Sequence, residues 1–354
     1  MKRQNKIILI VLLVLLALAV VIFFMKYRIV SYKEFGKTKF RIEKISGTLK
    51  TLRDFDVKDT ARVDKIFLAD KQNNTILLER KDNYWQVNGD YVARRDFVDV
   101  LLETICDLEV AVPVPKTKMD FVLRSLSTTS TKVEIYQEGE LVKVYYVGGV
   151  TQDNTGTYML LEGSDEPFEV HIPGFAGFLN TRYTTSIYEW RDRILFNYDV
   201  KNIKSVTLEY PADPDQSFSA VNNGNNNYSI VLLKTGKPLQ GVDPMAVKEF
   251  MSRYKKVGFE IYMNDTDEYL KLDSILNSKS EMCIYTVEDI KGRKTRLKTF
   301  ARPNFKNTYD EEGHFYNNDI DRFYGVINND KDLILLQYTL FDLLTKKPGD
   351  FVAR

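Results

Sequence analysis

The chain has 354 residues, of which 44% are hydrophobic and 12% aromatic, so it can form two domains with substantial cores and is not a disordered protein. Its 50 basic and 49 acidic residues give a formal net charge of +1, so no overall field would attract nucleic acid. Two cysteines without a Cys or His at ligand spacing argue against a structural zinc site.

The N-terminal segment is predicted to be a membrane helix. The 19 residues from Ile7 to Met25 carry no charge, and at about 1.5 Å per residue they roughly match a hydrocarbon core of about 30 Å. A cleaved signal peptide is the alternative, but the apolar run is long for one, and Lys26-Tyr27-Arg28 stands where a small-residue cleavage site would be. We therefore expect residues 7–25 to be a signal anchor that contacts the lipid bilayer.

The orientation of this anchor does not follow from charge counting, because more basic residues follow the helix than precede it. A short cationic tail is unfavourable to translocate, whereas a large domain after a signal anchor usually crosses regardless of charge. We therefore expect residues 1–6 to be a cytoplasmic tail and the bulk of this single-pass chain to be extracytoplasmic. Residues 26–62 are interpreted as a stalk ending in an entry segment, Asp54-Phe55-Asp56-Val57, that pairs with the first sheet.

The first predicted repeat covers residues 63–186 and starts with a meander. Apolar residues alternate over 63–68, and strands at 75–80 and 84–87 lead to the turn Asn88-Gly89. An amphipathic helix follows over 94–108, because its apolar residues recur at helical spacing; they are Val98, Leu101, Leu102, Ile105 and Leu108.

The rest of this repeat alternates helices and strands. We expect a strand at 110–114, a short helix at 120–126, and a hairpin of strands 132–136 and 141–147 joined across Glu138-Gly139. A second strand pair, 157–161 and 168–172, leads to a closing helix at 175–181.

Residues 203–346 repeat this pattern, which indicates a tandem duplication. A second helix carries its apolar residues at the same spacing, namely Val247, Phe250, Met251, Tyr254 and Val257. Strand positions match as well: Val63, Ile66 and Leu68 correspond to Ile203, Val206 and Leu208, Trp85 and Val87 to Tyr228 and Ile230, and Phe168 and Val170 to Leu333 and Leu335. The predicted fold is therefore α+β, with two duplicated antiparallel-sheet-plus-helix domains after one transmembrane helix. Residues 187–202 are a connector and residues 347–354 a C-terminal tail.

Two segments of the second repeat differ from the first and are candidate binding loops. One is the asparagine-rich turn at 222–227, with Asn223 and Asn226. The other is the insertion at 304–318, with Tyr309 and His314.

No residue set predicts catalysis, a cofactor or a metal. Neither His171 nor His314 stands beside a nucleophile motif, so structural or surface roles are expected for both. The acidic residues at 310–321 lack the spacing of a calcium loop, and no phosphate-binding glycine motif predicts a nucleotide. Cys106 and Cys283 fall in different repeats and are expected to be buried thiols, with pairing left open.

The aromatic residues of the first repeat could alternatively form a binding surface for a glycan or a peptide. Most of these residues lie on strands in alternation, so core packing is the expected role. They are Trp85, Tyr84, Tyr91, Tyr145, Tyr146 and Tyr158.

The entry segment 54–57, the strand 63–68, Tyr84-Trp85-Gln86-Val87 and the helix after it together resemble the family catalogued as domain of unknown function 4340. The resemblance extends over residues 54–344. It implies a protein of the bacterial inner (cytoplasmic) membrane tethered by one N-terminal helix. It also implies an association with auxiliary components of ABC-type exporters, including ones linked to gliding motility, and brings no catalytic residues.

These patterns favour a non-enzymatic, membrane-anchored, extracytoplasmic binding or scaffold module with a protein partner in the cell envelope. An auxiliary place in an ABC-type transport complex is the extension that the resemblance suggests. The competing interpretation is a cell-envelope enzyme with its site in the cleft between the two repeats, which would need converging polar groups of shifted pKa.

Overall fold

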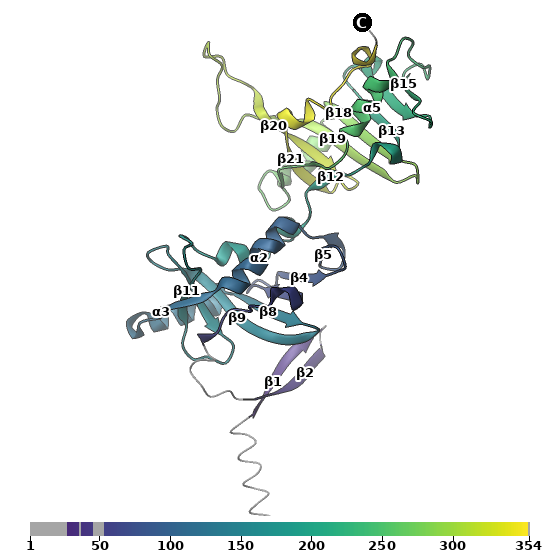
Figure 1. Ribbon diagram of the computed structural model, residues 1–354. Helices are drawn as coiled ribbons and strands as arrows, with labels where there is room; N and C mark the ends of the chain where they lie inside the picture. Colours follow the sequence, from purple (N-terminus) through teal and green to yellow (C-terminus); the bar gives the residue numbers. More distant parts are fainter. Residues whose placement is uncertain (1–26, 35–36, 45–52, 353–354) are drawn as a thin grey trace, which may run out of the picture. The chain divides into compact units, whose positions relative to one another are not determined.

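The computed structural model describes residues 27–34, 37–44 and 53–352 (Figure 1). The predicted membrane helix at 7–25 and the tail at 1–6 lie outside the described residues. Among the residues that are described, no helix is both long enough and apolar enough to cross a membrane. The predicted stalk contains an antiparallel hairpin of β1 (Tyr27–Glu34) and β2 (Lys37–Lys44) and, further on, the short 3-10 helix η2 (Thr60–Arg62).

Two large antiparallel sheets contain most of the other strands, which confirms a mixed α+β fold. The first sheet has nine strands in the order β6-β5-β4-β3-β8-β9-β10-β11-β7. The second has eight strands in the order β15-β14-β13-β18-β19-β20-β21-β17. A separate pair joins β12 (Ile194–Phe196) to β16 (Val257–Gly258).

The strands of the first sheet are β3 (Val63–Ala69), β4 (Thr75–Arg80), β5 (Trp85–Val87), β6 (Tyr91–Val92), β7 (Glu109–Pro113), β8 (Thr131–Gln137), β9 (Glu140–Val150), β10 (Thr157–Leu161) and β11 (Phe168–His171). Those of the second sheet are β13 (Ile203–Glu209), β14 (Phe218–Asn222), β15 (Tyr228–Leu232), β17 (Ile261–Tyr262), β18 (Cys283–Asp289), β19 (Lys294–Pro303), β20 (Asn318–Ile327) and β21 (Asp332–Gln337). The helices are α2 (Arg95–Asp107), α3 (Lys116–Thr129), α4 (Ile187–Trp190), α5 (Pro244–Ser252), α6 (Leu272–Asn277) and α7 (Tyr338–Phe341).

The strands and turns predicted for the first sheet are confirmed. In the tight turn after β5, Asn88 and Gly89 have φ of 51° and 79°, the left-handed conformation that the sequence Asn-Gly favours. Glu138 and Gly139, in the turn between β8 and β9, are also left-handed, with φ of 51° and 80°. The main helix is confirmed as α2, with Val98, Leu101 and Ile105 buried.

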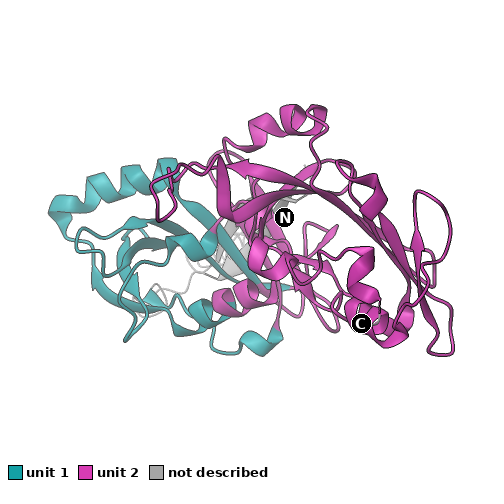
Figure 2. Cartoon of the chain, turned by 90° about the horizontal axis from the view of Figure 1, so that it is seen from above, with its two compact units in different colours: residues 1–62, 102–135, 140–183 teal, residues 63–101, 136–139, 184–354 magenta. Residues whose placement is uncertain are grey.

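The chain divides into two compact units, coloured separately in Figure 2. Unit 1 contains residues 1–62, 102–135 and 140–183, and unit 2 contains residues 63–101, 136–139 and 184–354.

Unit 1 is held together by α3 and by a group of aromatic rings. Helix α3 packs on β9 and β10 through Val122 and Leu126. It is longer than the predicted helix at 120–126, because it begins directly after Pro115, which stands at its N-cap. The entry segment does not form a strand: instead Phe55 is buried, with its ring centroid 6.0 Å from that of Tyr145 and 6.1 Å from that of Phe168.

The closing helix predicted at 175–181 is wrong. Most of this segment is irregular, and only the 3-10 helix η3 (Asn180–Tyr183) forms at its end. Gly174 and Gly177 have positive φ of 79° and 150°, which a right-handed helix does not accommodate. Tyr183 is nevertheless buried, and its hydroxyl lies 3.1 Å from that of Tyr145.

In unit 2, helix α5 packs on β14 and β15 over the larger core. Its start is capped by Asp243, whose side chain accepts the N–H of Met245 at 2.9 Å. The prediction that this helix continues to Val257 is wrong, because α5 ends at Ser252 and Val257 belongs to β16. The chain reverses here through Lys256, whose φ is +57°.

The C-terminal segment and α6 complete unit 2. Phe351, in the predicted tail, is buried in the larger core, 5.4 Å from Phe218 and 5.3 Å from Phe250 between ring centroids. Helix α6 contributes Leu272 to a smaller cluster with Phe300 and Tyr324.

The predicted counterparts Phe168 and Leu333 lie in different surroundings in their two sheets. Tyr158, in the cluster beside α3, pairs with Glu169, so the neighbouring Phe168 faces away from α3. Leu333, its predicted counterpart, lies in the cluster beside α6, whereas Leu336 lies in the larger core. A shift of one residue moves a side chain to the opposite face of a strand, and continuous apolar runs such as β21 hide that shift.

The connector at 187–202 pairs with strands on both sides. The N–H of Arg94 donates to the carbonyl of Trp190 at 2.7 Å, and the N–H of Asp192 donates to that of Val92 at 2.9 Å. A few residues later, β12 pairs with β16. Trp190 is fully buried, and its ring centroid lies 4.5 Å from that of Phe97.

A buried ion pair lies at the centre of this connector. Arg191, only 5% exposed, donates from Nη2 to Asp332 Oδ2 at 2.6 Å, at the start of β21. Its guanidinium carbon lies 4.2 Å from the ring centroid of Tyr91 and 4.3 Å from that of Tyr262, distances typical of cation–π contacts. Asn264 and Asn328 also donate to the Asp332 carboxylate.

We expect Arg191→Met to lower the free energy of unfolding by about 3–5 kcal/mol, because Asp332 would be left as a buried, uncompensated charge. Chemical unfolding followed by tryptophan fluorescence measures the loss. The control is Arg95→Met, which removes an exposed pair with Asp99 and should cost less than about 1 kcal/mol. A loss below that value for Arg191→Met would contradict this account.

Gly325→Ala should destabilise the second sheet by about 1–3 kcal/mol through overpacking. A Cβ at Gly325 would lie 2.7 Å from Leu336 and 2.8 Å from Leu297. The matched control is Gly149→Ala on β9, where a Cβ meets nothing within 4 Å. Equal midpoints of thermal unfolding for the two variants would show that the β20 backbone shifts to accommodate the Cβ without loss of stability, which would contradict this prediction.

Candidate functional site

The candidate site is the long hairpin, residues 304–317, which connects β19 to β20 and extends beyond the second sheet (Figure 1). The connection between β9 and β10, residues 151–156, is much shorter. The extension corresponds to the segment predicted as an insertion, and its conformation is determined by two side chains of its own.

Asn304 holds the base of the long hairpin. Its side chain is buried, and Nδ2 donates to the carbonyl oxygens of Thr308 at 3.0 Å and Tyr316 at 2.8 Å. Its Oδ1 accepts the N–H of Thr308 at 3.2 Å. One amide thereby satisfies backbone groups from both arms of the hairpin, among them the Thr308 N–H and the Tyr316 carbonyl.

Asp310 closes the tip in a similar way. Its Oδ1 accepts the N–H groups of Glu312 at 2.9 Å and His314 at 2.8 Å, while Oδ2 lies 3.1 Å from Nδ1 of His314. The hydrogen bond from the His314 N–H is the main cause that lowers the pKa of Asp310, so the carboxylate is ionised at neutral pH. With both ends fixed by hydrogen bonds, the hairpin is pre-organised for binding.

Apolar side chains are exposed on this pre-organised segment. Tyr309 is 59% exposed and Phe315 47% exposed, although the two residues form an antiparallel bridge with ring centroids 5.4 Å apart. Phe305, near the base, is also exposed. Large apolar side chains that remain in contact with water on a rigid element are typical of a surface that binds another protein.

The strands below the long hairpin are joined by a charged network around Arg302. The guanidinium donates to Glu268 at 2.7 and 3.0 Å and to Asp319 at 2.7 Å. Burial by itself raises the pKa of Glu268, but hydrogen bonds from Arg302 and Tyr324 outweigh burial and lower it. The network fixes the direction in which the hairpin leaves the sheet, because Arg302 and Asp319 stand next to its two ends.

The structure brings together only some of the predicted binding residues. Tyr309 and His314 share the long hairpin, whereas Asn223 and Asn226 lie in the turn between β14 and β15. Strand pairing places that turn at the opposite end of the sheet, beside the start of β13. The Asn223 side chain there donates to Ser229, and that of Asn226 accepts from Lys248.

Sequence reasoning did not identify Phe305 and Phe315 as exposed, or Asn304 as the residue that holds the base. The available signal was four aromatic residues within a polar insertion that lacks strand alternation. Of the aromatic residues considered for a binding surface, Trp85, Tyr145 and Tyr158 are buried, which confirms core packing for these three.

The other candidate residues are dispersed. His171 ends β11 opposite Glu109, and His314 is exposed at the hairpin tip. Both cysteines are free thiols, and burial raises the pKa of Cys283 to about 12. Within the described part of the chain, no group of three or more His, Cys, Asp or Glu side chains is placed to hold a metal ion.

Comparison with known proteins identifies one family. The model of the family described as "Domain of unknown function (DUF4340)" matches residues 85–274, which run from β5 to α6. Searches of curated proteins and of solved structures found no match to this chain.

We expect Asn304→Ala to loosen the long hairpin while leaving the sheet folded, because the Thr308 N–H and the Tyr316 carbonyl lose their hydrogen bonds to Asn304 at a cost of about 1–3 kcal/mol. Hydrogen exchange measured by mass spectrometry should accelerate over 304–317 and stay unchanged in β18 and β21. The matched control is Asn317→Ala, an exposed asparagine of the same hairpin. Equal exchange in the two variants would show that Asn304 does not hold the base.

Proposed function

The chain belongs to the family described as domain of unknown function 4340, and from this premise we propose that it is a membrane-anchored, extracytoplasmic binding module without enzymatic activity. In this proposal it binds a partner protein of the cell envelope through the long hairpin. The observation that carries the proposal is the exposed Tyr309–Phe315 pair on a hairpin held at its base and at its tip.

The anchor in this proposal is the uncharged run from Ile7 to Met25, which is long enough for one helix across the bacterial inner membrane. Residues 1–6 would remain in the cytoplasm, because a short basic tail is unfavourable to translocate. The bulk of the chain is then extracytoplasmic.

We further propose that the scaffold arose by duplication. The strand order β5-β4-β3-β8-β9-β10-β11-β7 of the first sheet corresponds, strand by strand, to β15-β14-β13-β18-β19-β20-β21-β17 of the second. Helix α5 follows β15, the third strand of its meander, and α2 follows β5 after the two-residue strand β6. Helices α3 and α6 precede β8 and β18. An identical order of non-consecutive strands is difficult to obtain by chance, so it supports a common ancestor for the two halves.

A duplicated scaffold makes its unshared segments informative. The long hairpin extends one strand connection of the second sheet, whereas the corresponding connection of the first is short. Loops that differ on a shared scaffold are where new binding functions arise. The family resemblance suggests a component of an ABC-type transport complex as the partner.

The experiment is site-specific photocrosslinking of the full chain in its native membranes, with p-benzoylphenylalanine in place of Tyr309. We expect one dominant adduct, identified by mass spectrometry as a transporter component. Adding Phe315→Ser should reduce the adduct about tenfold or more, because central aromatic residues supply much of the binding energy of an interface.

The control for this experiment carries the crosslinker at Tyr84, an exposed tyrosine of the first sheet's meander. The same adducts from both positions, or no adduct from position 309, would contradict a binding role of the hairpin. A dominant adduct with a protein outside any transporter would retain the binding role and contradict the transport assignment.

A further inference from the structure

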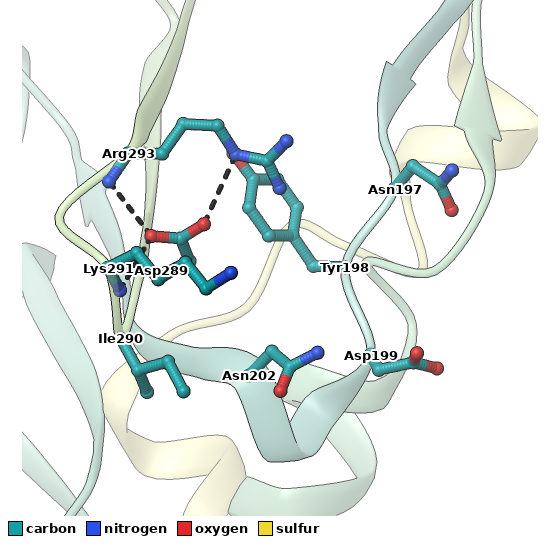
Figure 3. Close-up of a pocket in the computed structure, with 8 residues that line it drawn as sticks. All are labelled: Asn197, Tyr198, Asp199, Asn202, Asp289, Ile290, Lys291 and Arg293. Carbon is teal, nitrogen blue, oxygen red and sulfur yellow. Dashed lines mark hydrogen bonds and ion pairs between the residues drawn. The ribbon is translucent and has the colours of Figure 1, made fainter.

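A pocket lies at the end of the second sheet opposite the long hairpin (Figure 3). It has a volume of about 410 Å³. One wall is the segment from Asn197 to Asn202, which leads into β13, and the other is the tight turn from Asp289 to Arg293, which joins β18 to β19. The pocket is independent of the proposed function, because none of its residues belongs to the long hairpin.

The two walls of the pocket are joined by backbone and side-chain hydrogen bonds. The N–H of Ile290, in the turn, donates to the carbonyl of Asn202 on the facing wall at 2.9 Å. Within the turn, Asp289 Oδ1 accepts the N–H groups of Lys291 at 2.9 Å and Arg293 at 2.8 Å. Gly292, with φ of +83°, permits this tight reversal. The pocket is therefore formed before any ligand arrives.

The guanidinium of Arg293 is held by a hydrogen bond at one edge and by an aromatic ring against one face. Its Nε donates to Asp289 Oδ2 at 3.2 Å, and its central carbon lies 4.7 Å from the ring centroid of Tyr198 (Figure 3). Tyr198 cannot easily move, because it is buried and its hydroxyl bonds the Thr295 hydroxyl at 2.6 Å.

The terminal nitrogens of Arg293 remain for a ligand. In the part of the chain that the structure describes, neither has a hydrogen-bond partner. The amide side chains of Asn197 and Asn202 line the same pocket and likewise have no partner there. A guanidinium held through its Nε, with both terminal nitrogens unpaired, has the fork geometry that binds the two oxygens of a carboxylate.

The charges around the pocket suit a single carboxylate. Asp289 is already paired with Arg293, and Asp199 is paired with Lys255 at 2.8 Å. Among the side chains that line the pocket, Lys291 and Arg293 balance Asp199 and Asp289, so the lining carries no net charge. Ile290, 60% exposed on the turn, offers an apolar contact for the carbon chain of an organic ligand.

We propose that this pocket binds the carboxylate of a small organic acid or of a peptide C-terminus, with the terminal nitrogens of Arg293 as the donors and the amides of Asn197 and Asn202 as secondary contacts. A planar fork in a pocket whose lining has no net charge matches a monovalent carboxylate better than a divalent phosphate. The apolar contact at Ile290 favours a ligand with a carbon chain over a purely inorganic anion.

The test measures binding of N-acetyl-alanine, butyrate, N-acetyl-alaninamide and inorganic phosphate to the purified full chain by ligand-observed NMR. We expect both carboxylates to bind, and the neutral amide and phosphate to bind at least about tenfold more weakly. Tighter binding of N-acetyl-alanine than of butyrate assigns the peptide C-terminus as the source, and equal binding assigns the small acid.

Variants test the role of Arg293. Arg293→Gln should lower the affinity for N-acetyl-alanine about tenfold, and Arg293→Lys should lower it too, because an ammonium lacks the planar fork. The matched control is Arg296→Gln, an exposed arginine on β19 outside the pocket, which should bind like the unaltered chain. Equal thermal midpoints of the variants exclude unfolding as the cause.

Three results would overturn the proposal. If the neutral amide or phosphate binds as tightly as the carboxylate, the pocket does not select carboxylates. If Arg293→Gln leaves the affinity unchanged, Arg293 is not the donor. If no carboxylate binds to the unaltered chain, the pocket is not a carboxylate site.

Discussion

The buried pair of Arg191 and Asp332 is the constraint on which the rest of unit 2 depends. A guanidinium out of contact with water is stable only with a carboxylate partner and polarisable neighbours, and here Asp332 and the rings of Tyr91 and Tyr262 supply both. The pair joins the connector to the first residue of β21, while Tyr91 brings β6 to the same point. The connector is therefore a structural element of unit 2 rather than a linker, and the second sheet starts from a defined position.

The second sheet presents different chemistry at its two ends. The long hairpin at one end exposes aromatic rings, and the pocket at the other end presents a guanidinium and two amides. Both use the same physical means: a carboxylate, Asp310 or Asp289, accepts backbone N–H groups of its own turn and so fixes the turn's shape. Turns closed in this way lose little further entropy on binding, which suits both the hairpin and the pocket to ligands.

Much of the fold could be predicted from the sequence, because strands and helices leave periodic patterns of apolar residues. Alternation predicted β3 and β13, and helical spacing predicted α2. The errors fall where a pattern fits two structures. Tyr254 and Val257 continue a helical period but follow the end of α5, and every residue of β21 except the last is buried, so its register is not visible in alternation.

By itself the sequence determined the α+β class, the order of the strands along the chain, the uncharged N-terminal run and the insertion that holds Tyr309 and His314. Each of these follows from the spacing of apolar, charged or turn-forming residues within one stretch of the chain. Only the tertiary structure decided that Arg191 meets Asp332, that Tyr198 supports Arg293, and that Asn223 lies at the opposite end of the sheet from Tyr309. These relations join residues far apart in the chain, and they follow from strand pairing and burial, which no local spacing contains.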